Sequence, residues 1–192
     1  MDQSLVEKEF SRLLVDGLGL NLNDPNLLDT PKRVAKMYCQ ELLKNIGKEF
    51  NEFKEFPNSQ KYDQIVMSDR ISFVSMCSHH FLPFSGEAWV AYIPDVKLTG
   101  LSKLARCVEH YSAKPQLQEN LCQEVIKRID TILKPQGTFV FMRAIHNCVR
   151  CRGVKQSNSG MITSSVSGVF KTNQHLEEKA LAMIQISLKS TL

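Results

Sequence analysis

The stretch "ISFVSMCSHHFLPFSGEAWVAYIP", residues 71–94, holds two apolar runs separated by a short segment that contains Cys77, His79 and His80. The runs ISFVSM and GEAWVAYIP have the β-branched and aromatic composition of strands. Around Ala88 and Val90 the polar and apolar residues alternate less cleanly than a half-exposed strand requires. The stretch therefore predicts sheet strands with a cysteine and two of the chain's five histidines where one strand ends.

The segments around this stretch predict an α+β layer. They comprise a strand at 65–68, helices beginning at Ser102 and at Pro115, strands within 137–149 and 161–170, and a closing helix from about residue 174. The second helix places its leucines and isoleucines on one side. Strands followed by two helices and then by strands predict an antiparallel sheet with two helices on one face.

The N-terminal part predicts two helices. Residues 3–16 carry apolar side chains at helical spacing, and Gly17 is placed to end that helix. Thr30 is the expected N-cap of the second helix, Pro31 occupies its first turn, and Gly47 follows its last apolar residue. Another subunit is a possible cover for the apolar stripe of this helical pair.

Residues 48–63 are polar and predict a linker. We therefore expect an N-terminal helical arm and linker over residues 1–60 and a sheet-containing domain over 61–192. About four strands are too few to close a barrel, and long sheet edges are normally covered, charged or paired. Pairing between subunits would satisfy these edges, so we expect an oligomer.

Composition excludes several classes of partner. The chain has 192 residues and a net charge of +4, from 24 basic and 20 acidic side chains. No basic stripe with interleaved aromatic residues is present, so we expect no nucleic acid, and a small polyanion is the better ligand. Charges scattered through the first twenty residues argue against a signal peptide and a membrane segment. We expect a cytoplasmic protein whose six cysteines are free thiols or metal ligands.

Two clusters of cysteine and histidine suggest a metal site. Zinc takes thiolate and imidazole ligands, and a catalytic zinc keeps a fourth position for water. Cys77 and His80 can hold one side of an ion from a single turn, and Cys148 is the best candidate for a third ligand, because its stretch also holds a histidine close to a cysteine. His79 and His146 would then remain beside the metal as proton carriers.

Other interpretations of these residues stay open at this point. Cys148 and Cys151 are spaced as half of a zinc knuckle or as a redox pair. The first interpretation lacks a second CxxC, and the second lacks a βαβ context. Single cysteines are more often small buried hydrophobes than ligands. Spacing alone does not separate a catalytic metal site from coincidence.

The motifs TPKRVAKMY, CSHHFLPFSGEAWVAYIP, GLSKLARCVEHYS, PQLQENL and HNCVRCRG resemble those of the GTP cyclohydrolase I family. Members of this family are zinc enzymes that convert GTP to 7,8-dihydroneopterin triphosphate and formate. The resemblance runs from about residue 25 to the closing helix. It implies a tunnelling fold, in which sheets of neighbouring subunits join into a barrel, and a homo-oligomer, commonly a decamer, with sites at subunit interfaces.

The resemblance also implies roles for individual residues. By motif position, the zinc ligands are Cys77, His80 and Cys148, and the acid/base groups are His79 and His146. The remaining matches are Gln118 and Glu119 for the guanine edge, Ser102, Lys103, Arg106 and Arg152 for the triphosphate, and Arg33 and Lys36 for phosphate contacts from a neighbouring subunit.

Two positions depart from the family pattern. Ser78 stands where the family normally has Glu, and Cys151 stands where an apolar residue is usual. We expect Cys151 to fill space as a small hydrophobe. The change at Ser78 leaves open a related enzyme with an altered product or purine nucleotide. A further alternative is a non-catalytic nucleotide-binding protein with a structural zinc.

Overall fold

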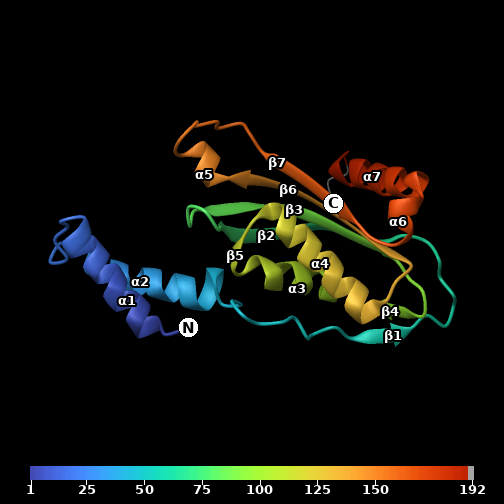
Figure 1. The fold of residues 1–192 in the computed structure, drawn as a ribbon, viewed down its shortest axis with the longest axis horizontal. Helices are drawn as coiled ribbons and strands as arrows, with labels where there is room; N and C mark the ends of the chain where they lie inside the picture. Colours follow the sequence, from blue (N-terminus) through green and yellow to red (C-terminus); the bar gives the residue numbers. More distant parts are fainter. Residues whose placement is uncertain (190–192) are drawn as a thin grey trace.

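The central feature of the protein is a five-stranded sheet, seen in a computed structural model that describes residues 1–189 (Figure 1). In spatial order its strands are β5 (Pro115–Gln116), β2 (Val66–Cys77), β3 (Pro83–Ile93), β6 (Gly137–His146) and β7 (Met161–Val166). The four long strands pair antiparallel, which confirms the predicted sheet. The short strand β5 is an unpredicted parallel addition beside β2.

A bulge explains why β2 looked like two strands in the sequence. The register of β2 against β3 shifts between Ser68 and Ile71. Arg70, inside this interval, has a positive φ of 46°. A bulge inserts residues without ending the strand and increases its local twist. The runs predicted separately at 65–68 and 71–76 are therefore one bent strand.

Helices cover both faces of the sheet. On one face lie α3 (Leu101–Ser112) and α4 (Gln118–Leu133), as predicted; on the other lie α6 (Val169–Thr172) and α7 (Gln174–Lys189) (Figure 1). The central strand β3 sends Val90 and Tyr92 into the first core and Trp89 and Ala91 into the second. Burial on both faces removes the alternation expected of a half-exposed strand.

The predicted start of the second core helix was wrong. Pro115 and Gln116 are extended and pair with Met76 and Cys77, so α4 begins only at Gln118. Proline is tolerated in a first helical turn and equally in a short edge strand, and tertiary pairing decides between the two here. As a result the segment between α3 and α4 lies directly beside the end of β2.

The N-terminal arm contains α1 (Gln3–Arg12), η1 (Leu13–Gly17), α2 (Thr30–Met37) and η2 (Tyr38–Leu42), where η marks a π-helical turn. Asp29, rather than the predicted Thr30, is the N-cap of α2, and Pro31 lies in its first turn as expected. The arm extends beyond one end of the sheet (Figure 1). It exposes several large apolar side chains, namely Leu5, Leu13, Leu18 and Leu28.

The predicted linker is held against the body of the protein. It contains β1 (Glu55–Pro57), which pairs antiparallel with β4 (Lys97–Thr99). Phe50 is only 2% exposed and belongs to the core beneath α3 and α4. The segment is therefore anchored at Phe50, at the buried Asn58 and by the β1–β4 pairing, while most of its other residues are exposed, in keeping with its polar composition.

The ladder between β3 and β6 is unusually close at Gly86. This residue faces Ala144, and a Cβ at Gly86 would lie 2.0 Å from the carbonyl oxygen of Arg143. A glycine is required wherever backbones approach this closely. The close approach brings the end of β6 next to the loop that carries the histidine pair.

None of the described helices, the last of which ends at Lys189, has the length and apolar character needed to cross a bilayer.

Candidate metal centre and its surroundings

The loop between β2 and β3 brings two of the predicted ligands together. The backbone N–H of Cys77 donates to the carbonyl of Leu82, and that of Phe81 donates to the carbonyl of Cys77, each at 2.9 Å. Phe81 has a positive φ of 51°, which reverses the chain toward β3. Inside this tight turn, Sγ of Cys77 lies 3.9 Å from Nδ1 of His80.

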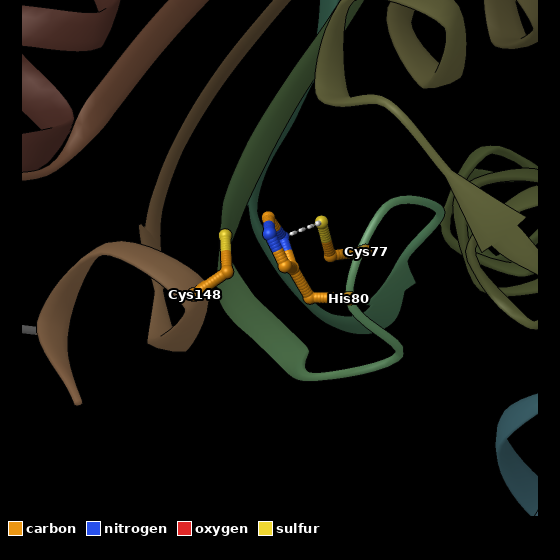
Figure 2. Close-up of side chains that lie close together, drawn as sticks. All are labelled: Cys77, His80 and Cys148. Carbon is orange, nitrogen blue, oxygen red and sulfur yellow. Dashed lines mark hydrogen bonds between the residues drawn. The ribbon is translucent and has the colours of Figure 1, made fainter. Parts of the chain in front are cut away.

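The third predicted ligand arrives from β6. This strand pairs His146 with Phe84 at the start of β3, and the short helix α5 (Asn147–Arg150) follows. Cys148 on α5 faces the loop, and the ligand atoms of Cys77, His80 and Cys148 all lie within 4.8 Å of one another (Figure 2). Among the described residues, this is the one group of three or more metal-ligating side chains.

The donor set fits a zinc ion. Two thiols and one imidazole are typical zinc ligands, and three protein ligands are the number found in catalytic sites. Burial is the main cause that raises the pKa of Cys148, and the neighbouring Cys77 thiol raises it further. The charge of Arg152 acts to lower it. A cation between the sulfur atoms favours their deprotonated forms, because a metal ligand binds as thiolate.

Arg152 places a positive charge beside the candidate centre. Its guanidinium is in hydrogen-bond contact with Nε2 of His80, on the side of the ring away from the Nδ1 that faces Cys77. Both Arg152 and His80 are exposed. Of the residues expected to bind phosphate, Arg152 is the one that the protomer itself places at the candidate metal centre.

Each of the two candidate proton carriers lies close before a ligand in the sequence: His79 directly precedes His80, and His146 lies two residues before Cys148. The exposed His79 ring is 6.2 Å from the His80 ring, centroid to centroid. His146 stacks on Phe84 and accepts or donates a hydrogen bond at 2.8 Å between its Nε2 and Oε1 of Gln118. Burial lowers the pKa of His146, and the charge of Glu119 acts in the opposite direction.

The start of α4 presents two adjacent residues with different environments. Gln118 is 1% exposed, and its side chain bonds entirely within the protomer. Glu119 is exposed. The carboxylate of Glu119 is therefore accessible to a ligand, whereas the amide of Gln118 is committed to the strands and to His146.

Several predicted phosphate contacts lie elsewhere in the protomer. The end of α3 leads into β5 beside Cys77, but Lys103 is near the start of that helix. A rise of about 1.5 Å per residue separates Lys103 from Ser112 by roughly 14 Å along the axis. Ser102 and Arg106 share that distant half of the helix, and Arg106 pairs with Glu52 at 3.2 Å.

Arg33 and Lys36 lie on the arm rather than at the candidate centre. Arg33 forms an exposed ion pair with Asp29, and Lys36 is exposed on the same helix, α2. One protomer thus brings together the ligand group, both histidines and Arg152. It leaves the α3 and α2 cations apart from them.

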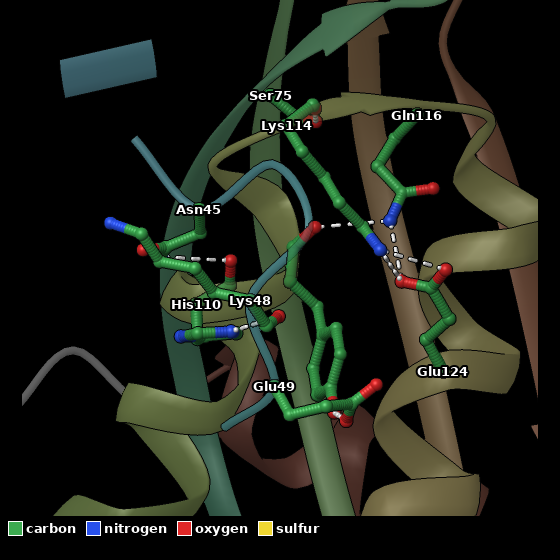
Figure 3. A network of polar contacts seen from close by, with 9 residues as sticks. Asn45, Lys48, Glu49, Ser75, His110, Lys114, Gln116 and Glu124 are labelled. Carbon is green, nitrogen blue, oxygen red and sulfur yellow. Dashed lines mark hydrogen bonds and ion pairs between the residues drawn. The ribbon is translucent and has the colours of Figure 1, made fainter. Parts of the chain in front are cut away.

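A polar network that includes Lys114, Gln116 and Glu124 was not predicted from the sequence (Figure 3), and it contacts the loop through Gln116. The carbonyl of Gln116 accepts from the N–H of Ser78, and the Gln116 side chain donates to Glu124 at 2.7 Å and to the carbonyl of Tyr111 at 3.0 Å. Lys114 also pairs with Glu124, at 2.9 Å. The register of Gln116 with Cys77 makes this network a base for the loop that carries Cys77 and His80.

The two departures from the family pattern are both on the surface. Ser78 is exposed, and its backbone is held by Gln116. Cys151 is also exposed, and its thiol donates to the carbonyl of Asn147 at 2.9 Å. The expectation that Cys151 fills space was therefore wrong, because α5 ends at the surface and offers no core for it. Its sulfur is not part of the ligand group.

Together, fold and site define an α+β protein with a candidate transition-metal centre where two sheet strands end. The family model described as GTP cyclohydrolase I matches residues 6–185. The chain belongs to the GTP cyclohydrolase I family.

Relatives match over nearly their whole lengths. The chain is 44% identical to GTP cyclohydrolase 1 of Streptococcus gordonii over 172 residues, which cover 89% of this chain and 91% of that protein. It is 40% identical to GTP cyclohydrolase 1 of Sulfurihydrogenibium sp., with 96% of each chain covered. A crystal structure of apo archaeosine synthase QueF-Like has a TM-score of 0.46 at 17% identity, covering 55% of this chain and 94% of that chain, and this match is too distant to support an argument.

Proposed function

We propose that the protein is a zinc-dependent GTP cyclohydrolase that converts GTP to 7,8-dihydroneopterin triphosphate and formate. The observation that carries the proposal is the convergence of Cys77, His80 and Cys148 from two strand ends in a chain of this family. When bound by these residues, zinc would supply hydroxide at neutral pH, because it lowers the pKa of its water from 15.7 to about 7.

His79 and His146 are the proposed proton carriers. Opening of the purine imidazole at C8 requires protons at the ring nitrogens, and later at the ribose as it opens and rearranges. Histidine is suited to both directions of transfer near neutral pH. The environments of the two rings differ, since His79 is exposed and His146 is stacked and hydrogen-bonded. This difference allows one ring to exchange protons with solvent while the other is held in a fixed orientation.

Guanine recognition is proposed for Gln118 and Glu119. The exposed carboxylate of Glu119 can accept two hydrogen bonds from the N1 and 2-amino groups of guanine. Its position next to Gln118 at the start of α4 places it near His146, whose pKa it influences. Binding of the base at this point would direct its imidazole ring toward the histidines.

The triphosphate is proposed to bind Arg152 together with cations from neighbouring subunits. Ser102, Lys103 and Arg106 lie at the opposite end of α3 from the metal ligands, and Arg33 and Lys36 lie on the arm. These residues reach a common site only if other protomers supply them. Arginine and lysine at such a position would clamp the phosphates through charge-assisted hydrogen bonds.

We also propose the tunnelling fold and a homodecamer, in which sheets join between subunits and neighbouring chains share sites. Support comes from the sheet order, in which β7 is an outer strand, and from Ile162 on that strand, which is 62% exposed. The arm and linker over 1–60 and the catalytic domain over 61–192 are the proposed units. A cytoplasmic location is supported by the six cysteines, all free thiols in the described part of the chain.

Turnover of GTP by the zinc-loaded protein tests the proposal. The expected products are one formate per GTP and a pterin that becomes fluorescent on oxidation. Formation of formate with a product of different mass would indicate the altered chemistry considered for Ser78. Binding of GTP without either product, at full zinc occupancy, would overturn the proposal in favour of a non-catalytic nucleotide-binding protein.

A further inference from the structure

The buried amide of Gln118 has only one possible orientation. Its Nε2 lies 3.2 Å from the carbonyl oxygen of Met142 and 3.3 Å from that of Met161, and 3.0 Å from Oγ1 of Thr163. Carbonyl oxygens only accept hydrogen bonds, so the atom that faces them must be the NH2 group. A flipped amide would place an oxygen against two oxygens inside a buried site, which is strongly unfavourable.

This orientation determines what His146 does at its own nitrogen. Oε1 of Gln118 is the atom left to face Nε2 of His146, at 2.8 Å. An amide oxygen accepts, so Nε2 of His146 must carry the hydrogen. In a neutral imidazole the other nitrogen, Nδ1, is then unprotonated, and in an imidazolium both carry hydrogen. Nε2 keeps its hydrogen in either state.

The plane of the ring is fixed by a second contact. The rings of His146 and Phe84 are stacked, with centroids 4.4 Å apart and an interplanar angle of 7°. The two residues are also direct partners in the β3–β6 ladder. One contact thus holds the face of the imidazole, and the other holds its Nε2 edge.

We propose that Gln118 is a positioning residue for His146: its Oε1 accepts the Nε2–H and, together with the stacking on Phe84, holds the imidazole in one orientation and in the Nε2–H tautomer. The inference rests on the proposed function, in which His146 transfers protons. It gives Gln118 a role toward a protein side chain in addition to, or in place of, a contact with guanine.

The tautomer of His146 can be measured directly. A two-bond 1H–15N correlation spectrum of the zinc-loaded, 15N-histidine-labelled protein, recorded well above the ordinary imidazole pKa, distinguishes the two neutral tautomers. The His146→Asn variant assigns the signals. Hydrogen on Nε2 is the expected result, and hydrogen on Nδ1 overturns the inference. The spectrum needs no substrate, so a failure of the proposed function, seen as no turnover by the wild type, is recognised separately.

Kinetics of Gln118→Met separate positioning from guanine binding. Methionine keeps the length of the side chain but accepts no strong hydrogen bond. We expect kcat to fall by about 10- to 100-fold, as for other lost orienting contacts, with KM changed less than about threefold. The spectrum of this variant should show both tautomers. A raised KM with unchanged kcat and a single tautomer would overturn the inference and assign Gln118 to the base.

Thr163→Val is the matched control. It removes one partner of the Gln118 amide but leaves the two carbonyl oxygens and the acceptor Oε1 in place. The Nε2–H tautomer should therefore persist in this variant. Its loss would mean that Gln118 does not determine the state of His146, and the inference would fail. The wild-type spectrum remains decisive if Gln118→Met does not fold.

Discussion

Phe84 and His146 are direct partners across the β3–β6 ladder, and their rings lie parallel with centroids 4.4 Å apart. The pairing of β3 with β6 therefore helps to fix the orientation of the His146 imidazole, which is a proposed catalytic group. Two residues further along β3, Gly86 faces Ala144 at a distance that admits no side chain. Strand pairing and active-site geometry are linked at this point.

Substitution Gly86→Ala should weaken this link. The added Cβ would lie 2.0 Å from the carbonyl oxygen of Arg143, so the strands must separate. We expect a loss of about 1–3 kcal/mol in the free energy of unfolding, measured in urea, as for other overpacked sites. Gly17→Ala is the control, because its Cβ would make only an ordinary contact at 3.4 Å. Equal stability of the two variants would show that the close approach is not required.

Metal content should separate ligands from proton carriers. We expect Cys148→Ala to lose zinc, because it removes one of three converging donors. His146→Ala should keep about one zinc per chain, as expected for a site of three ligands, and lose turnover of GTP. Metal analysis after dialysis and a formate assay test both variants. The reverse pattern would contradict the proposed division of roles.

The network behind the loop should tune metal affinity. Glu124 accepts from Gln116 and pairs with Lys114, and Gln116 holds the backbone of Ser78. Glu124→Ala should weaken zinc binding by about 10-fold, since outer contacts that orient a site typically have effects of this size. Competition with a chelator measures the affinity.

The control for this experiment is Glu109→Ala. Glu109 forms an exposed ion pair with Lys44, and such pairs contribute little. Zinc affinity should be unchanged in this variant. An equal loss in both variants would show that the effect at Glu124 is not specific to the loop.

Thiol reactivity should differ sharply among the cysteines. Burial raises the pKa of Cys107 to about 12 and that of Cys122 to about 11. The thiolate is the reactive form, so at pH values near neutrality these two buried groups are almost entirely unreactive thiols. Cys151 is exposed. We expect a fast phase with an aromatic disulfide reagent that disappears in Cys151→Ser and persists in Cys107→Ser. Modification of Cys107 as fast as that of Cys151 would contradict the structure.

The ligand group was predictable from the sequence because its chemistry is local. Cys77 and His80 are separated by a single turn, and thiol and imidazole groups at such a spacing point to zinc. Cys148 required the further assumption that two strand ends meet, and the β3–β6 ladder confirms that assumption. The α+β class followed in the same way from the order of strands and helices.

Other features depend on contacts that no local pattern encodes. Pro115 suits a helical first turn, but pairing with Met76 makes it part of a strand. The role proposed for Gln118 rests on the carbonyl oxygens of Met142 and Met161, which only the folded sheet brings to its side chain. Cys151 was assigned to the interior by its residue type, and the end of α5 places it on the surface.

The direction of α3 has a consequence for genetics. One end of this helix leads to the loop of Cys77, and the other carries Lys103 roughly 14 Å away by the helical rise. Under the proposed assembly, each chain contributes its ligand group to one catalytic centre and its Lys103 to another. Co-expression of a Cys148→Ala chain with a Lys103→Ala chain would then create some intact centres from two inactive parents, so an allele damaged in the ligand group and an allele damaged at the start of α3 complement each other.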